Sequence, residues 1–287
     1  MTTYFRLALK AARVFGVRSY RVESLRSHVD KRRREFSDSD VFLASYPRSG
    51  NTWMRRLLAD VVLQIHGYDT RTDLPVCFKR VVPEVNPGVE LTLHPGIRMP
   101  HRVMKTHSFY TPVMKSVVVL YRLPCASLTS FFHFSTRQAA WQHIAKQGSD
   151  PFCRSMVSDW QRHSKSYIRA IEQGRVNALP ASYEELAASP AEVLHRVCRW
   201  LKLDVQMSNC RRAVENQEFR KLQEWERNNK TPKRSKFFRT GMVDGFEQEL
   251  SQATIDFIGQ RANPIYERLE ELKQETGTAV QSGSASP

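Results

Sequence analysis

The chain has 287 residues, of which 41% are hydrophobic and 25% charged, as is ordinary for a globular protein. No apolar run approaches the roughly 20 residues of a transmembrane helix, and the N-terminus lacks the apolar stretch and cleavage site of a secretory signal. Five cysteines without a CxxC pair favour a reducing compartment over a disulfide framework, so we expect a cytoplasmic protein. The net charge of +15 predicts attraction to polyanions without identifying which.

The N-terminal segment, residues 1–38, is a strongly basic appendage with one lysine and three arginines at 31–34. Phe5, Leu9 and Ala12 recur at helical spacing, which predicts a short basic helix. Such a helix could make peripheral contact with an anionic membrane. A helix packed on the domain, or a frayed tail, is the favoured alternative.

Strand and helix patterns alternate along residues 39–275, which we interpret as one domain. Strands are predicted at 41–45, 101–106, 116–121 and 175–179, and helices at 51–65, 123–137, 183–188, 190–201, 211–227 and 254–273. The proline-rich stretch 70–101 is predicted to be irregular. The alternation predicts an α/β fold with a central, mainly parallel sheet flanked by helices, and ligands at the carboxyl ends of the strands. Residues 276–287 are small and polar, which predicts a disordered tail.

The loop after the first predicted strand has the features of an anion-binding site. Residues 45–53 read SYPRSGNTW and open into a helix, whose first amide groups are unpaired and partly positive. Gly50 permits close backbone approach, and Arg48 supplies a charged fork. Ser49, Asn51 and Thr52 offer side-chain donors, although simple helix capping is the alternative interpretation. The Walker A pattern is not met.

This loop resembles the 5′-phosphosulfate loop, usually YPKSGTTW, of sulfotransferases that use 3′-phosphoadenosine-5′-phosphosulfate (PAPS). The resemblance implies a P-loop-like fold and sulfuryl transfer from PAPS, without a metal, to a hydroxyl or amine. The acceptor would be a small molecule, a lipid or a carbohydrate. Trp53 resembles the adenine-stacking tryptophan of the family, with a core aromatic as the alternative. Arg48 stands where the family has a lysine that contacts the bridging oxygen, so we expect it to stabilise charge and not to donate a proton.

A second anion-binding pair follows the third predicted strand. Arg122 directly follows that strand, and Ser130 lies eight residues later. In the resembled family, an arginine and a serine at this spacing bind the 3′-phosphate. An arginine donates in bidentate fashion and a serine donates through its hydroxyl. The pair therefore predicts a site that distinguishes PAPS from ATP.

Further segments resemble other parts of the nucleotide site. Tyr183 and Phe219 resemble adenine-contacting residues of the family. Arg239, Thr240 and Gly241 resemble part of its RKGxxGDW segment, which closes over the 3′-phosphate. The match is partial, because Thr240 replaces a lysine and residues 243–246 read VDGF.

The segment Lys105-Thr106-His107 resembles the family's KTH segment, which contains its catalytic base. A histidine that titrates near neutrality is suited to accept the proton of an acceptor hydroxyl, so His107 is predicted to be the general base. Lys105 and Arg48 are predicted to stabilise the charge on the transferring group. A lone histidine at a strand end would otherwise be interpreted as structural.

Two other functions stay open on the residues alone. The strand, loop and helix unit is compatible with a kinase or another P-loop-type phosphotransferase, and the net charge with a nucleic-acid-binding protein. Because the sequence contains no recognition motif for nucleic acid, we expect no nucleic-acid partner. Residues 70–101 and 136–160 are expected to shape the acceptor pocket, but no pattern in them identifies the acceptor. The family's dimerisation pattern is not kept around residues 247–256, so the oligomeric state is not predicted.

Overall fold

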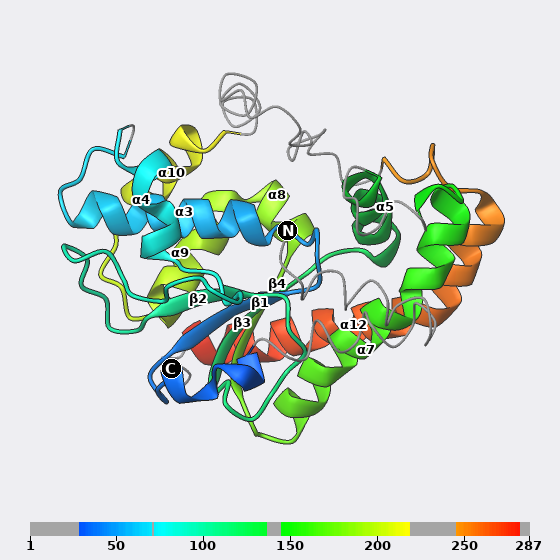
Figure 1. The fold of residues 1–287 in the computed structure, drawn as a ribbon, viewed down its shortest axis with the longest axis horizontal. Helices are drawn as coiled ribbons and strands as arrows, with labels where there is room; N and C mark the ends of the chain where they lie inside the picture. Colours follow the sequence, from blue (N-terminus) through cyan, green and yellow to red (C-terminus); the bar gives the residue numbers. More distant parts are fainter. Residues whose placement is uncertain (1–28, 71, 137–144, 219–244, 282–287) are drawn as a thin grey trace.

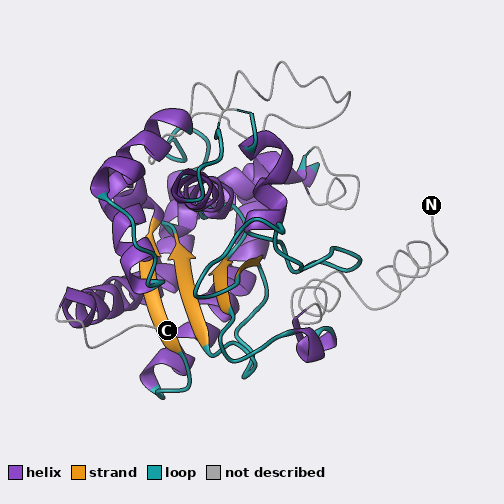
Figure 2. Ribbon diagram, turned by 90° about the vertical axis from the view of Figure 1, so that its left-hand side faces the viewer, coloured by secondary structure: helices purple, strands orange, loops and turns teal. Residues whose placement is uncertain are grey.

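Four parallel strands form the centre of the structure, a computed structural model that describes residues 29–70, 72–136, 145–218 and 245–281 (Figure 1). They are β1 Val41–Ser45, β2 Val103–Thr106, β3 Ser116–Tyr121 and β4 Asn177–Ser182. The order is β2-β1-β3-β4, and every neighbouring pair is parallel. Figure 2 shows the strand arrows side by side among the helices. The predicted α/β domain with a mainly parallel sheet is confirmed.

The sheet is covered on both faces. Successive side chains of a strand point to opposite faces, and every residue of β1 and of β3 is buried. Leu43 and Val118 belong to one apolar cluster, and Phe42 and Val117 belong to another on the opposite face. This explains the continuous apolar runs, which are typical of strands covered on both sides.

Two groups of helices provide this cover. On one face lie α3 Asn51–Ile65, α4 Leu74–Val81, α8 Tyr183–Ala188, α9 Pro190–Trp200 and α10 Met207–Asn216 (Figure 1). On the other face lie α7 Ser149–Glu172 and α12 Gln252–Gln281, and α5 Pro124–Ser135 follows β3 and packs on α7. The short 3-10 helix η1 Arg33–Glu35 precedes β1.

Several boundaries differ from the sequence-based prediction. Helix α4 interrupts the stretch 70–101 that was predicted to be irregular, and α7 was not predicted at all. The buried side of α7 includes Asp159, His163 and Ser164, so its apolar stripe is broken by polar residues. Helix α12 extends to Gln281, past the position where the predicted tail begins.

The described part of the basic N-terminal segment packs on the domain. Val29 is fully buried in the cluster that contains Phe42. Arg32 donates a hydrogen bond of 2.8 Å to the carbonyl oxygen of Asn86, and Arg102 donates one of 2.7 Å to that of Glu35. Residues 1–28, including the predicted basic helix, lie outside the described residues.

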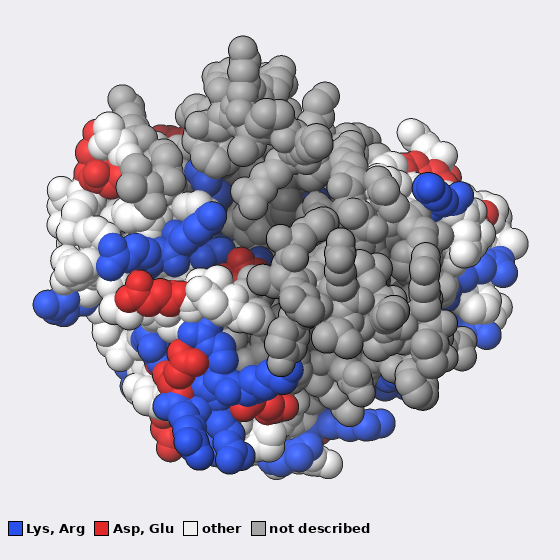
Figure 3. Space-filling view, in the orientation of Figure 1, with Lys and Arg blue, Asp and Glu red and all other residues white. Residues whose placement is uncertain are grey.

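The surface carries both signs of charge. On the face shown in Figure 3, basic side chains are interspersed with acidic ones. The described helices include none with the length and apolarity to cross a membrane.

The strand order reverses next to β1. From β1 the chain goes to β2 on one side, and β3 then pairs with β1 on the other side. In open parallel sheets, ligands bind where the strand order reverses, beyond the carboxyl ends of the strands. The three predicted motifs all follow the carboxyl ends of β1, β2 and β3.

Candidate functional site

The loop between β1 and α3 adopts two left-handed backbone positions. Arg48 has φ of 72° and Gly50 has φ of 88°. Gly50 is the N-cap of α3, and no side chain caps it. The amide groups at the start of the 15-residue helix α3 therefore retain their partial positive charge and their capacity to bind an anion.

Gly50 is also in close contact with Tyr183, the first residue of α8. A Cβ atom built on Gly50 would lie 2.7 Å from Cδ2 of the Tyr183 ring. The position therefore excludes a side chain for two reasons, namely its left-handed backbone and this close contact.

The polar side chains of the loop are partly occupied by the protein itself. The side-chain nitrogen Nδ2 of Asn51 donates hydrogen bonds to the carbonyl oxygen of Leu43 and to Oγ of Ser45, both at 3.0 Å. Oγ of Ser49 lies 3.5 Å from Oγ of Ser127, and Ser49 is fully buried. These side chains hold the loop in shape, whereas Thr52 lies half-buried in the first turn of α3.

The two predicted phosphate motifs meet in space. Nε of Arg48 donates a hydrogen bond of 3.1 Å to Oγ of Ser130 on α5. Nη1 of Arg122, directly after β3, donates one of 3.3 Å to the carbonyl oxygen of Arg48. Two arginines and a serine from separate segments are thus brought together, and each of these side chains can donate hydrogen bonds to an anionic group.

An aromatic group lies beside these arginines. The guanidinium carbon of Arg122 lies 4.2 Å from the centre of the Tyr183 ring, a cation–π contact. The rings of Trp53 and Tyr183 meet edge to face, with centres 6.4 Å apart. The predicted adenine-contacting residues Trp53 and Tyr183 therefore lie together next to the phosphate motifs.

His107 follows β2 and points back to the end of β1. Its Nδ1 donates a hydrogen bond of 2.8 Å to the carbonyl oxygen of Ser45, which leaves Nε2 as the basic nitrogen of the neutral ring. Burial, and next the charge of Lys105, lower the pKa of His107 to about 4. The ring is therefore neutral at physiological pH, and its pKa lies below the near-neutral value that was expected from the sequence.

Lys105 lies beside His107 and forms an ion pair that the sequence did not predict. Its Nζ lies 2.8 Å from Oε1 of Glu84, and the other carboxylate oxygen of Glu84 lies 3.4 Å from Nη1 of Arg55 on α3. Glu84 comes from the proline-rich stretch 70–101, where no regular spacing relates it to Lys105.

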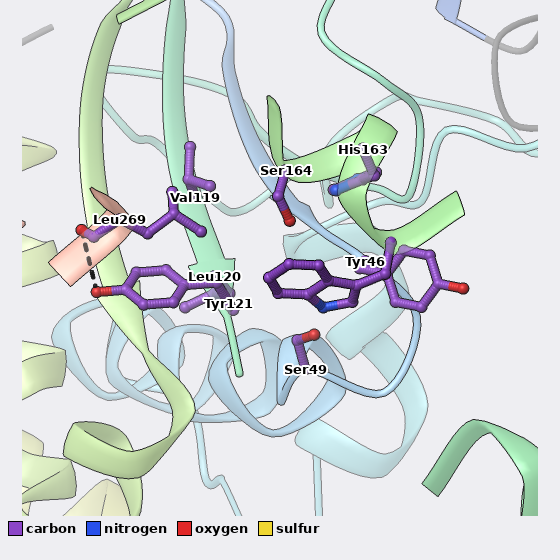
Figure 4. A pocket seen from close by; sticks show the side chains of 9 residues that line it. Tyr46, Ser49, Val119, Leu120, Tyr121, His163, Ser164 and Leu269 are labelled. Carbon is purple, nitrogen blue, oxygen red and sulfur yellow. Dashed lines mark hydrogen bonds between the residues drawn. The ribbon is translucent and has the colours of Figure 1, made fainter. Parts of the chain in front are cut away.

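A buried histidine, His163, packs next to the site. The ring of His163 on α7 packs against Tyr46, Phe109 and Tyr167, with centres 5.2 to 5.8 Å apart. Burial, followed by the nearby His107, lowers the pKa of His163 to about 3. A small pocket between α7 and the phosphate loop is lined by His163, Tyr46 and Ser49, among others (Figure 4). Helix α7 therefore packs against the inner side of the loop, a role that no motif in its sequence indicated.

Some predicted site residues cannot be placed. Phe219, Arg239, Thr240 and Gly241 lie outside the described residues. Among the residues that are described, no three His, Cys, Asp or Glu side chains gather as a metal site would need.

Comparison with known proteins places this chain in a family. Residues 38–273 match the family model described as a sulfotransferase domain. The chain is 25% identical over 188 residues to cytosolic sulfotransferase 7 of Arabidopsis thaliana, in a match covering 58% of this chain and 57% of that protein. The match therefore spans a little over half the length of that relative.

Two solved structures share the fold. One is a mouse sulfotransferase complexed with PAP, with a TM-score of 0.58 and 16% identity over 86% of this chain and 95% of that one. The other is a retinol dehydratase in a complex with retinol and PAP, with a TM-score of 0.52 and 16% identity over 80% and 82% of the two chains. These likenesses confirm the predicted P-loop-like fold.

Proposed function

The chain belongs to the sulfotransferase-domain family, and on that premise we propose that it transfers a sulfuryl group from PAPS to a hydroxyl or amine of a small-molecule acceptor. The observation that supports this most is the meeting of Arg48, Ser130 and Arg122, with Arg48 near enough to His107 for its charge to lower the histidine's pKa. A nucleotide with two phosphate groups would need the two arginines and the serine. Removal of a proton from the acceptor would need the histidine.

In this proposal, the two anionic ends of the donor bind to different elements. The first amide groups of α3, together with Arg48, bind the 5′-phosphosulfate, because a helix N-terminus and a guanidinium both favour an anion. Arg122 and Ser130 bind the 3′-phosphate. Trp53 and Tyr183 contact the adenine, whose flat face suits aromatic stacking.

The reacting centre would work by proton removal and charge stabilisation. Nε2 of His107 accepts the proton as the acceptor oxygen or nitrogen forms its bond to sulfur. The bond between sulfur and the bridging oxygen breaks, and its electron pair leaves on the 5′-phosphate of 3′,5′-ADP. Arg48 and Lys105 stabilise the negative charge on the sulfuryl group and on the leaving phosphate, and fixed charges of this kind usually contribute most to such transfers.

The acceptor class and the location are also proposals. The retinol-bound structure supports a small-molecule acceptor for this chain by likeness of fold. The name of the Arabidopsis relative supports a cytosolic location. Contact of residues 1–28 with an anionic membrane stays a prediction.

Nucleotide binding provides the first test. We expect 3′,5′-ADP to raise the melting temperature, because a ligand that binds only the folded state stabilises it. The reference ligands are 5′-AMP, which lacks the 3′-phosphate, and Mg-ATP. A shift with Mg-ATP alone would contradict the proposal and favour a phosphotransferase.

Turnover provides the second test, with radiolabelled PAPS and a panel of alcohols, phenols and amines. His107→Ala should lower kcat at least about 100-fold, within the range of general-base catalysis, while the affinity for 3′,5′-ADP stays close to that of the wild type. The matched control is His195→Ala, at a half-buried position of α9 that belongs to none of the predicted motifs, and it should keep wild-type turnover. Wild-type turnover by His107→Ala would refute its role as the base.

A further inference from the structure

Glu84 lies on a segment that pairs with β2 at the position of Lys105. The backbone amide of Lys105 donates a hydrogen bond of 2.7 Å to the carbonyl oxygen of Pro83. The amide of Val85 donates one of 2.8 Å back to the carbonyl oxygen of Lys105. This parallel bridge fixes Glu84 beside Lys105, with a register that the backbone determines.

The Glu84 carboxylate contacts two cations that are buried. Besides Lys105, whose side chain is 10% exposed, it reaches Arg55, whose side chain is 5% exposed. Nε of Arg55 also donates a hydrogen bond of 2.5 Å to the carbonyl oxygen of Val82. Glu84 therefore connects the helix after the phosphate loop to the strand that leads to His107.

Neighbouring charges and burial have opposite effects on the ionisation of Glu84. Burial opposes ionisation of Glu84, but Lys105 and then His107 and Arg55 outweigh it and lower the pKa of Glu84 to about 2. Burial lowers the pKa of Lys105, and the charge of Glu84 counteracts this effect. Without Glu84, the Lys105 ammonium would be buried near Arg55 and Arg48 with less compensation, and its neutral form would be favoured.

From these contacts we infer that Glu84 is a positioning residue for the proposed transfer, which holds the Lys105 ammonium charged and fixed next to His107. The inference rests on the proposed function, in which Lys105 must be charged to stabilise the leaving phosphate. Glu84 itself is not a base in this arrangement, because both of its carboxylate oxygens are engaged with cations.

The test is the alkaline limb of the pH profile of kcat, measured with an aliphatic alcohol acceptor that does not titrate. The groups that bear on Lys105 and His107 are Glu84, Arg55 from α3, Arg48 from the loop and His163 from α7. Glu84→Gln keeps the size of the side chain and removes its charge. An opposite charge at this distance shifts a pKa by about 1 to 3 units, so the alkaline limb should move to lower pH by about that amount.

Three further variants make the result specific. Glu84→Asp keeps the charge and should restore most of the wild-type limb. Glu172→Gln removes the same charge from an exposed ion pair with Arg268 at 2.9 Å and should leave the limb in place. The arginine in Lys105→Arg stays charged throughout the pH range of the assay, so the pH profile of this variant should have no alkaline limb. This variant tests whether the limb belongs to Lys105 even if Glu84→Gln does not fold.

The outcomes separate this inference from the proposed function. Transfer by the wild type with an unmoved limb in Glu84→Gln would overturn the role of Glu84 and leave the transferase proposal intact. A limb that persists in Lys105→Arg would overturn it as well. No transfer by the wild type would overturn the proposed function, and the role of Glu84 with it.

Discussion

Replacing Gly50 by alanine should destabilise the protein through its backbone conformation and through one contact, and that contact should also weaken nucleotide binding. The new Cβ would lie 2.7 Å from the Tyr183 ring, at a residue with φ of 88°. A left-handed residue with a Cβ costs about 1 to 2 kcal/mol, and overpacking adds about 1 to 3 kcal/mol. We therefore expect Gly50→Ala to lower the free energy of unfolding by about 2 to 5 kcal/mol.

The chain contains a matched control for this variant. Gly67 has φ of 76°, and nothing lies within 4 Å of a Cβ placed on it. Gly67→Ala should therefore lose only the backbone component, about 1 to 2 kcal/mol. Urea unfolding of the two variants measures the difference, which isolates the contact with Tyr183.

The same contact connects the substitution to binding. A shift of the Tyr183 ring would change its contact with Arg122, whose guanidinium carbon lies 4.2 Å from the ring centre. We expect Gly50→Ala to weaken 3′,5′-ADP binding, measured by calorimetry, at least about tenfold, which corresponds to 1.4 kcal/mol. Gly67→Ala should leave the affinity unchanged. Equal losses of stability and equal affinities in the two variants would refute the reasoning.

Two further predictions concern the nucleotide and the base. Ser130→Ala should weaken binding of 3′,5′-ADP about tenfold, as expected when a hydrogen bond to a charged group is lost. It should leave binding of 5′-AMP unchanged, as measured by calorimetry. Equal losses of affinity for both nucleotides would place Ser130 away from the 3′-phosphate. Because the pKa of His107 is lowered to about 4, its neutral form persists as the pH falls from 7 to 5.5, so kcat/KM should change by less than about twofold over that range. An acid limb centred at the ordinary histidine value of 6.5 would show that the base is not His107. Because of the same lowered pKa, His107 binds more protons in the unfolded chain than in the folded one between about pH 4 and pH 6.5. The contribution of His107 to the free energy of unfolding should therefore decrease as the pH falls through this range.

The substitution of arginine for the family's usual lysine in the loop has a structural setting. Arg48 reaches Ser130 through Nε, at 3.1 Å, and its guanidinium carbon lies 5.5 Å from the centre of the Phe134 ring. A guanidinium can donate in several directions at once, whereas an ammonium acts as a point charge. Arg48 can therefore contact α5 and still present donors to an anion.

Local patterns in the sequence were sufficient for the parts of the fold that are buried or periodic. The strands at Val41–Ser45 and Ser116–Tyr121 and the helix at Asn51–Ile65 agree with the predicted ranges, because continuous apolar runs and helical spacing are local signals. The missed helix α7 shows the limit of this approach. Its buried face includes Asp159, His163 and Ser164, and only the neighbouring segments make it favourable to bury these polar residues.

The sequence by itself predicted several chemical groups of the candidate site and the order in which the chain supplies them. Three short patterns could be recognised in the sequence, namely the SYPRSGNTW loop, the KTH segment and the spacing of Arg122 and Ser130. Only the tertiary structure decided which groups meet. The ion pair of Glu84 with Lys105 depends on a parallel bridge between two irregularly spaced segments, and the contact of Gly50 with Tyr183 depends on how α8 docks on the loop. Such contacts join residues far apart in the chain, so they are set by the packing of the sheet and its helices and leave no local trace in the sequence.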